Sequence, residues 1–85
     1  MIKPMPVVHQ REITLDRLES GTDAVVAGLE GAPAFRRRLL EAGFVEGSRV
    51  RFLMATPFGD PLVFFLRGAS IALRKSEARC VKVRL

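Results

Sequence analysis

The sequence predicts a mainly β protein with one short helix, folded as a small closed or nearly closed β-barrel. Four or five short segments show the apolar–polar alternation or the β-branched content that is typical of strands, and glycine or proline separates them. One segment, 34–42, instead has apolar residues at helical spacing. Because barrel closure removes exposed strand edges, strands this short within one small domain favour a barrel.

The first elements of the domain are a helical turn and a strand. We expect a short helical turn at 14–21, for which Thr14 can act as the N-terminal cap, and a strand at 23–29. Every second side chain of this strand would point to one face: Val25, Ala27 and Leu29.

The helix predicted at 34–42 has recognisable ends. Pro33 suits the first helical position, and Gly43 suits the left-handed position that ends a helix. Phe44 directly follows and can fold back on Leu39. The apolar face of the helix would consist of Phe35, Leu39 and Ala42.

Three consecutive arginines, Arg36, Arg37 and Arg38, lie on this helix. At about 100° per residue they fan over about 200° of its surface, so they do not form a single stripe. They can form a solvated face whose methylenes cover apolar surface, or a patch that binds phosphates. The wide fan favours the solvated face.

The second half of the sequence is rich in strands. Residues 49–55 alternate, which predicts Val50, Phe52 and Met54 on one face. A turn with one glycine and two prolines follows at 56–61.

The remaining elements are two strands, a helical turn and a last strand. We expect strands at 61–67 and 70–75, a single helical turn at 75–79 that Ser76 caps, and a strand at 80–85. In the last strand the inward side chains would be Val81, Val83 and Leu85.

Three segments of the sequence together resemble the FeoA family. They are LDRLESGTDAVVAGLEG (15–31), RRRLLEAGFVEGSRVRF (36–52) and ATPFGDPLVFFLRGASIALRKSEARCVKV (55–83). The likeness covers about residues 13 to 84. It implies an SH3-like β-barrel over 12–85 as a single domain, preceded by an N-terminal arm at 1–11 that the family pattern does not include.

The resemblance also implies a function. Members of this family are small cytoplasmic proteins that support Fe(II) uptake. The expected partner is the membrane transporter FeoB, contacted at its cytoplasmic part, which carries a GTPase domain. The expected role is non-enzymatic and regulatory, with membrane contact only through the transporter.

Composition agrees with a soluble cytoplasmic domain. The sequence is 48% hydrophobic and 27% charged, as in globular proteins, and its net charge of +5 favours an anionic partner. One cysteine cannot form an internal disulfide, which favours a reducing compartment. No apolar run resembles a signal peptide or a membrane span.

Catalytic and metal-binding patterns are absent from the sequence. His9 is the single histidine and lies in the arm, and no motif pairs it with Cys80 or with a serine. We therefore expect no enzymatic activity and no required cofactor. A divalent transition metal could bind at an intermolecular site, with His9 from one chain and carboxylates from another. The expected role of Cys80 is that of a small, partly buried side chain.

One segment, PLVFFLR, is apolar on both faces of its predicted strand. The second face could be covered by the chain's own helix, which we favour, or by a partner. The partner surface would consist of Phe58, Val63 and Phe65 as apolar anchors, with Arg67, Arg74 and Lys75 as a charged rim. The sequence has no tryptophan or tyrosine, which disfavours a groove for proline-rich ligands.

Two other functions stay open at this point. The net charge is compatible with a small nucleic-acid-binding barrel, as are four basic residues near the end of the sequence: Lys82, Arg84, Arg74 and Lys75. Base-stacking aromatics are scarce on the predicted outer faces, which counts against this function. A metal-bridged, self-associating regulator is the other alternative. We expect no nucleic-acid partner, and a monomer or weak dimer.

Overall fold

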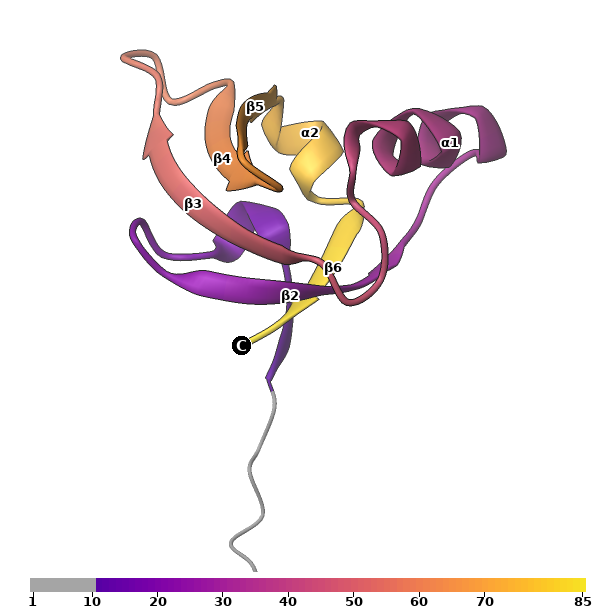
Figure 1. Ribbon diagram of the computed structural model, residues 1–85. Helices are drawn as coiled ribbons and strands as arrows, with labels where there is room; N and C mark the ends of the chain where they lie inside the picture. The colour runs from indigo at the N-terminus through magenta and orange to yellow at the C-terminus, as the bar shows by residue number, and fades with distance from the viewer. Residues whose placement is uncertain (1–10) are drawn as a thin grey trace, which may run out of the picture.

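The computed structural model describes residues 11–85 and contains six strands and three short helical segments (Figure 1). The strands are β1 (Glu12–Thr14), β2 (Asp23–Leu29), β3 (Arg49–Ala55), β4 (Leu62–Leu66), β5 (Ala69–Leu73) and β6 (Val81–Arg84). The helical segments are the 3₁₀ turn η1 (Leu15–Arg17), α1 (Pro33–Ala42) and α2 (Lys75–Ala78). His9 and almost all of the predicted arm lie outside the described residues.

The strands form one antiparallel sheet in the order β1-β6-β2-β3-β4-β5. The sheet curls around its core, and no pairing between its outer strands β1 and β5 closes it within residues 11–85 (Figure 1). The predicted mainly β fold with a nearly closed barrel is therefore confirmed. The helix α1 lies to one side of the barrel, in the connection between β2 and β3 (Figure 1).

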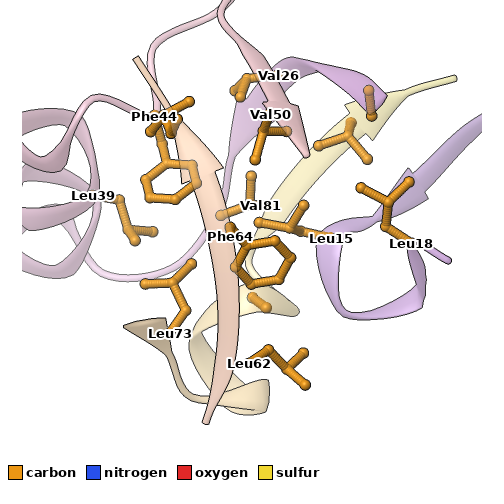
Figure 2. Packing of buried hydrophobic residues seen from close by; sticks show 14 residues of the cluster. Leu15, Leu18, Val26, Leu39, Phe44, Val50, Leu62, Phe64, Leu73 and Val81 are labelled. Carbon is orange, nitrogen blue, oxygen red and sulfur yellow. The ribbon is translucent and has the colours of Figure 1, made fainter. Parts of the chain in front are cut away.

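The core lies inside the curled sheet, around Phe64 (Figure 2). Alternate residues of β4 point into it, as the alternating strand pattern requires. The buried hydrophobic side chains are Leu15, Leu18, Ala24, Val26, Leu39, Phe44, Val50, Leu62, Phe64, Leu66, Leu73, Ala78, Val81 and Val83. The inward alternation predicted for the last strand is confirmed at Val81 and Val83, whereas Leu85 is 48% exposed.

A bulge changes which side chains of β2 share a face. The pairing of β2 with β6 shifts between Val26 and Gly28, so Ala27 is left without a partner in the ladder. Before the bulge Val25 lies opposite Arg84, and after it Leu29 lies opposite the buried Val81. The prediction that Val25, Ala27 and Leu29 point to one face is therefore wrong.

A second bulge has the same effect in β3. Phe52 pairs with Phe64 and Met54 pairs with Val63, which leaves Leu53 as the extra residue. The Ser20 hydroxyl donates a hydrogen bond of 3.1 Å to the Leu53 carbonyl. Because the alternation restarts after the bulge, Met54 lies on the other face from Val50 and Phe52 and is 59% exposed. The prediction that these three side chains share one face is therefore wrong for Met54.

The end of α1 follows the prediction. Gly43 has a φ of 112°, and its N–H donates to the Leu40 carbonyl at 3.0 Å. The Phe44 N–H donates to the Leu39 carbonyl at 3.0 Å, and both side chains belong to the buried core cluster (Figure 2). The predicted contact of Phe44 with Leu39 is therefore confirmed, and it fixes α1 to the barrel.

Replacing Gly43 with alanine should lower the free energy of unfolding by about 1–3 kcal/mol. A Cβ atom there would lie 3.2 Å from Leu66 Cδ2 and 3.3 Å from Arg67 Cδ, in a backbone conformation that side chains disfavour. Urea unfolding monitored by circular dichroism measures the change. Gly28→Ala is the control, because a Cβ there meets nothing within 4 Å. An equal loss in both variants would contradict this account of Gly43.

The arginines of α1 are exposed, as expected for a solvated face. Arg38 Nη2 lies 3.3 Å from Glu77 Oε2, an ion pair that joins α1 to α2. The Arg38 guanidinium carbon also lies 5.9 Å from the centre of the Phe35 ring. Of the predicted apolar face, Leu39 is buried and Phe35 is half-buried, but Ala42 is exposed.

The two shorter helical segments differ from prediction in their caps. Thr14 does precede η1, but its hydroxyl donates to the Asp16 carboxylate rather than accepting from the backbone. Ser76 lies inside α2 and does not cap it. The Arg74 N–H donates to Glu77 Oε1 and the Lys75 N–H donates to Asp60 Oδ1, each at 2.9 Å. The carboxylate of Asp60 thus ties the 56–61 loop to the start of α2.

Candidate interaction surface

The outer face of the sheet is the side of β2, β3 and β4 that points away from the core. Cross-strand pairing sets its composition row by row. Asp23 lies opposite Arg51, and Arg51 lies opposite Phe65. On one side of this row Val25 lies opposite Arg49, and on the other side Met54 lies opposite Val63.

A hollow on the outer face, which we call the arginine hollow, has a volume of about 590 Å³. The turn Arg67–Gly68 between β4 and β5 lines it together with five side chains: Asp23, Arg49, Arg51, Leu53 and Phe65. The bulge in β3 contributes to the hollow, because it leaves Leu53 beside the outer row. Phe65 is 43% exposed and forms part of the apolar lining.

The arginine hollow carries an excess of positive charge. Arg51 holds Asp23 with two hydrogen bonds, Nε to Oδ1 at 2.8 Å and Nη2 to Oδ2 at 3.1 Å. Mainly through these bonds, the pKa of Asp23 is lowered and the pKa of Arg51 is raised from their ordinary values. Within residues 11–85 no carboxylate lies within ion-pair distance of Arg49 or Arg67. The hollow therefore contains two arginines that its one aspartate does not neutralise.

Arg67 occupies an unusual backbone position. It forms a two-residue hairpin turn with Gly68, and the φ angles are 51° at Arg67 and 83° at Gly68. Turns with two positive φ angles favour Asn-Gly or Asp-Gly, and a left-handed conformation is uncommon for arginine. Among the described residues, Arg67 is the one non-glycine residue with positive φ. The strained residue lies at the edge of the arginine hollow.

Comparison with known proteins identifies the family. Residues 13–85 match the FeoA domain. The chain belongs to the FeoA family.

Three relatives of this FeoA-family protein are informative. The chain is 34% identical over 71 residues to the Fe(2+) transport protein A/Fe(2+) transporter FeoB fusion protein of Porphyromonas gingivalis. The matched residues make up 84% of this chain but 8% of that protein. The FeoA structure from Chlorobium tepidum is 33% identical, with a TM-score of 0.80 over 86% of this chain and 70% of the other. Stenotrophomonas maltophilia FeoA, solved in complex with zinc and described as an SH3 domain protein, is 40% identical, with a TM-score of 0.74 over 84% of this chain and 88% of the other.

The SH3-like barrel expected from the sequence is therefore confirmed. The link of this family to ferrous iron transport is likewise supported by the fusion relative, of which this chain spans a small fraction.

The six residues predicted to contact a partner fall into two groups. Phe65 and Arg67 line the arginine hollow, and Val63 lies in the adjoining row of the outer face. Phe58, Arg74 and Lys75 instead lie where the 56–61 loop meets α2, and Phe58 is 97% exposed. Their role in partner binding stays a prediction.

Coverage of the second face by the chain's own helix, which the sequence favoured, is wrong for Phe65. Its exposed fraction of 43% shows that neither α1 nor α2 covers its side chain. Sequence reasoning also did not identify Asp23, Arg49 and Arg51 as neighbours of Phe65. The alternation in 49–55 that predicts Val50 and Phe52 on one face also puts Arg49 and Arg51 on the other, but the register that brings Phe65 beside Arg51 has no signal in the sequence.

No metal centre is visible in the described part of the chain. Residues 11–85 contain no group of three or more histidine, cysteine, aspartate or glutamate side chains that could hold a metal ion. Cys80 is half-buried, and its Sγ lies 3.6 Å from the Ser76 carbonyl. No helix within these residues has the length and apolar character needed to cross a membrane.

Proposed function

We propose that this FeoA-family protein is a non-enzymatic accessory protein of bacterial ferrous iron uptake that acts in the cytoplasm by binding a FeoB-type transporter. The observation that carries the proposal is the P. gingivalis relative, in which the two proteins form one polypeptide. A covalent link gives two modules a high effective concentration for each other. A separate chain must reach the same partner through a binding surface of its own.

The outer face suits such a role. Exposed aromatic and long apolar side chains surrounded by arginines are typical of protein–protein contacts. Phe65 is 43% exposed and lines the hollow together with Arg49, Arg51 and Arg67, and Met54 on the same face is 59% exposed. The proposal involves no catalytic step and no cofactor held within one chain. The S. maltophilia relative was solved in complex with zinc. A second hypothesis to test for this protein is therefore that a metal joins two chains, with His9 as one ligand.

The transporter proposal is tested by capture of the purified FeoB-type transporter from detergent solution onto immobilised protein at two salt concentrations. We expect capture at both, weaker at the higher salt, because the apolar contact of Phe65 does not weaken with salt whereas exposed charge pairs are screened. Fe(II) uptake under iron limitation should also fall when the gene is deleted. Either no capture or unchanged uptake would reject the proposal. In a separate capture from cell extract, recovery of nucleic acid alone that is lost at high salt would favour the nucleic-acid-binding alternative.

Metal-bridged association is tested separately by gel filtration with and without a chelator. We expect the same elution volume in both, as a monomer or weak dimer. A shift to smaller size on chelation that is absent from a His9→Ala variant would show that a metal joins two chains through His9.

A further inference from the structure

We propose that the arginine hollow binds an acidic segment of the partner that also carries an apolar side chain. The inference rests on the proposed function, and it adds the contact surface and the chemistry of the bound segment. The occupant we infer is a segment of the transporter's cytoplasmic part in which carboxylates flank a leucine, phenylalanine or similar residue.

The charge of the hollow selects for carboxylates. Arg49 and Arg67 lack carboxylate partners within residues 11–85, whereas Asp23 and Arg51 neutralise each other through two hydrogen bonds. An arginine that enters an interface unpaired loses hydration without compensation, but one that meets a carboxylate gains a charge-assisted hydrogen bond. Arg84, opposite Val25 on β6, extends the positive surface beyond the hollow.

The lining of the hollow selects for an apolar side chain as well. Leu53 and Phe65 line it next to Gly68, which adds no side chain. Exposed apolar surface bordered by arginines suits a partner segment that inserts an apolar anchor residue and carries charged residues on either side of it. A nucleic-acid strand would fit less well, because sequence-tolerant binding of single strands uses several stacking aromatics and the hollow contains one.

The backbone at Arg67 also supports a binding role. Asparagine or glycine would suit a φ of 51° better than arginine, and local strain is concentrated at functional sites. Position 67 lines the hollow and carries an arginine, although asparagine or glycine would fit the turn better. A binding role for Arg67 accounts for that choice.

A second hollow, between β2 and α1, is the alternative location. Its charged lining residues are Arg36, Arg37 and Glu46, and its apolar floor includes the fully buried Phe44. It serves as the internal control, because the same change of charge can be made there at a distance from Phe65.

The decisive experiment measures the Kd of the purified FeoB-type transporter for three forms of the full chain by surface plasmon resonance. The test variant combines Arg49→Glu with Arg67→Asn, and the control combines Arg36→Glu with Arg37→Gln, so both lose equal positive charge. We expect Kd to rise at least about tenfold for the test variant and to change less than about threefold for the control. Melting temperatures check that both variants fold, and asparagine should be tolerated at position 67 because it suits the turn.

The outcomes separate the two proposals. No binding by the unsubstituted chain would reject the proposed function and this inference with it. Binding that the test variant retains, or that the control loses equally, would reject the arginine hollow and leave the proposed function intact. Short overlapping peptides from the transporter's cytoplasmic part identify the segment, and bound peptides without acidic residues would overturn the stated chemistry.

A second variant predicts a gain. Asp23→Asn removes the one carboxylate of the hollow and releases Arg51 for the partner. Kd should fall by about threefold, because an acidic segment would no longer meet a like charge. Unchanged or weaker binding by a folded Asp23→Asn variant would contradict the inference.

Discussion

Replacing Phe64 with alanine should lower the free energy of unfolding by about 3–5 kcal/mol, a large part of the roughly 5–15 kcal/mol available to a small domain. The Phe64 side chain is fully buried at the centre of the barrel, and its ring lies 5.3 Å from that of Phe52. Removing the ring leaves a cavity that the surrounding strands cannot fill. Thermal and urea unfolding monitored by circular dichroism measure the loss.

Phe64→Leu is the matched control for this prediction. Leucine retains most of the buried apolar volume, so the loss should be about half as large or less. If alanine and leucine destabilised the protein equally, or if Phe64→Ala melted like the unsubstituted chain, the central position of Phe64 in the core would be wrong.

Replacing the neighbouring Phe65 with alanine should instead leave stability nearly unchanged and weaken binding to the transporter. Its side chain points to the outer face and is 43% exposed, so the free energy of unfolding should change by less than about 1 kcal/mol. Affinity for the transporter should fall by about 2 kcal/mol, or about thirtyfold, because exposed aromatic residues at the centre of an interface dominate binding. Surface plasmon resonance and urea unfolding on the same preparation give both numbers.

Leu40→Ala provides the comparison for Phe65→Ala. Leu40 is an exposed apolar residue on α1, with an exposed fraction of 47%, and lies outside the arginine hollow. Its replacement should leave transporter affinity unchanged. Full affinity in a folded Phe65→Ala variant would remove Phe65 from the binding surface, and an equal loss in Leu40→Ala would indicate a general effect of apolar exposure.

Local patterns in the sequence predicted most of the elements. The alternation in 80–85 placed Val81 and Val83 correctly, and the Gly43–Phe44 pair located the end of α1 because its hydrogen bonds and contact involve nearby residues. These features depend on a few neighbouring residues, so a single sequence is enough to predict them.

The side chains misplaced in β2 and β3 share a different cause. Ala27 and Leu53 are bulged because of how a partner strand pairs with them, and each bulge reverses the face of the residues that follow. The cap of α2 likewise involves Asp60, fifteen positions before Lys75 in the sequence. The arginine hollow depends on the same kind of information, since Asp23, Arg51 and Phe65 become neighbours only through register.

The strand order has a consequence for how the chain assembles. β3, β4 and β5 pair with their neighbours in sequence, so this meander closes only short loops, and β2 pairs with β3 across the connection that contains α1. β1, in contrast, pairs with β6 alone, from the far end of the domain. Since distant contacts require more loop-closure entropy, we expect the meander to form early and the β1–β6 pair to form last. Arg51, Leu53, Phe65 and Arg67 would then be in place before the barrel is complete, while the β1–β6 edge would open first in hydrogen exchange.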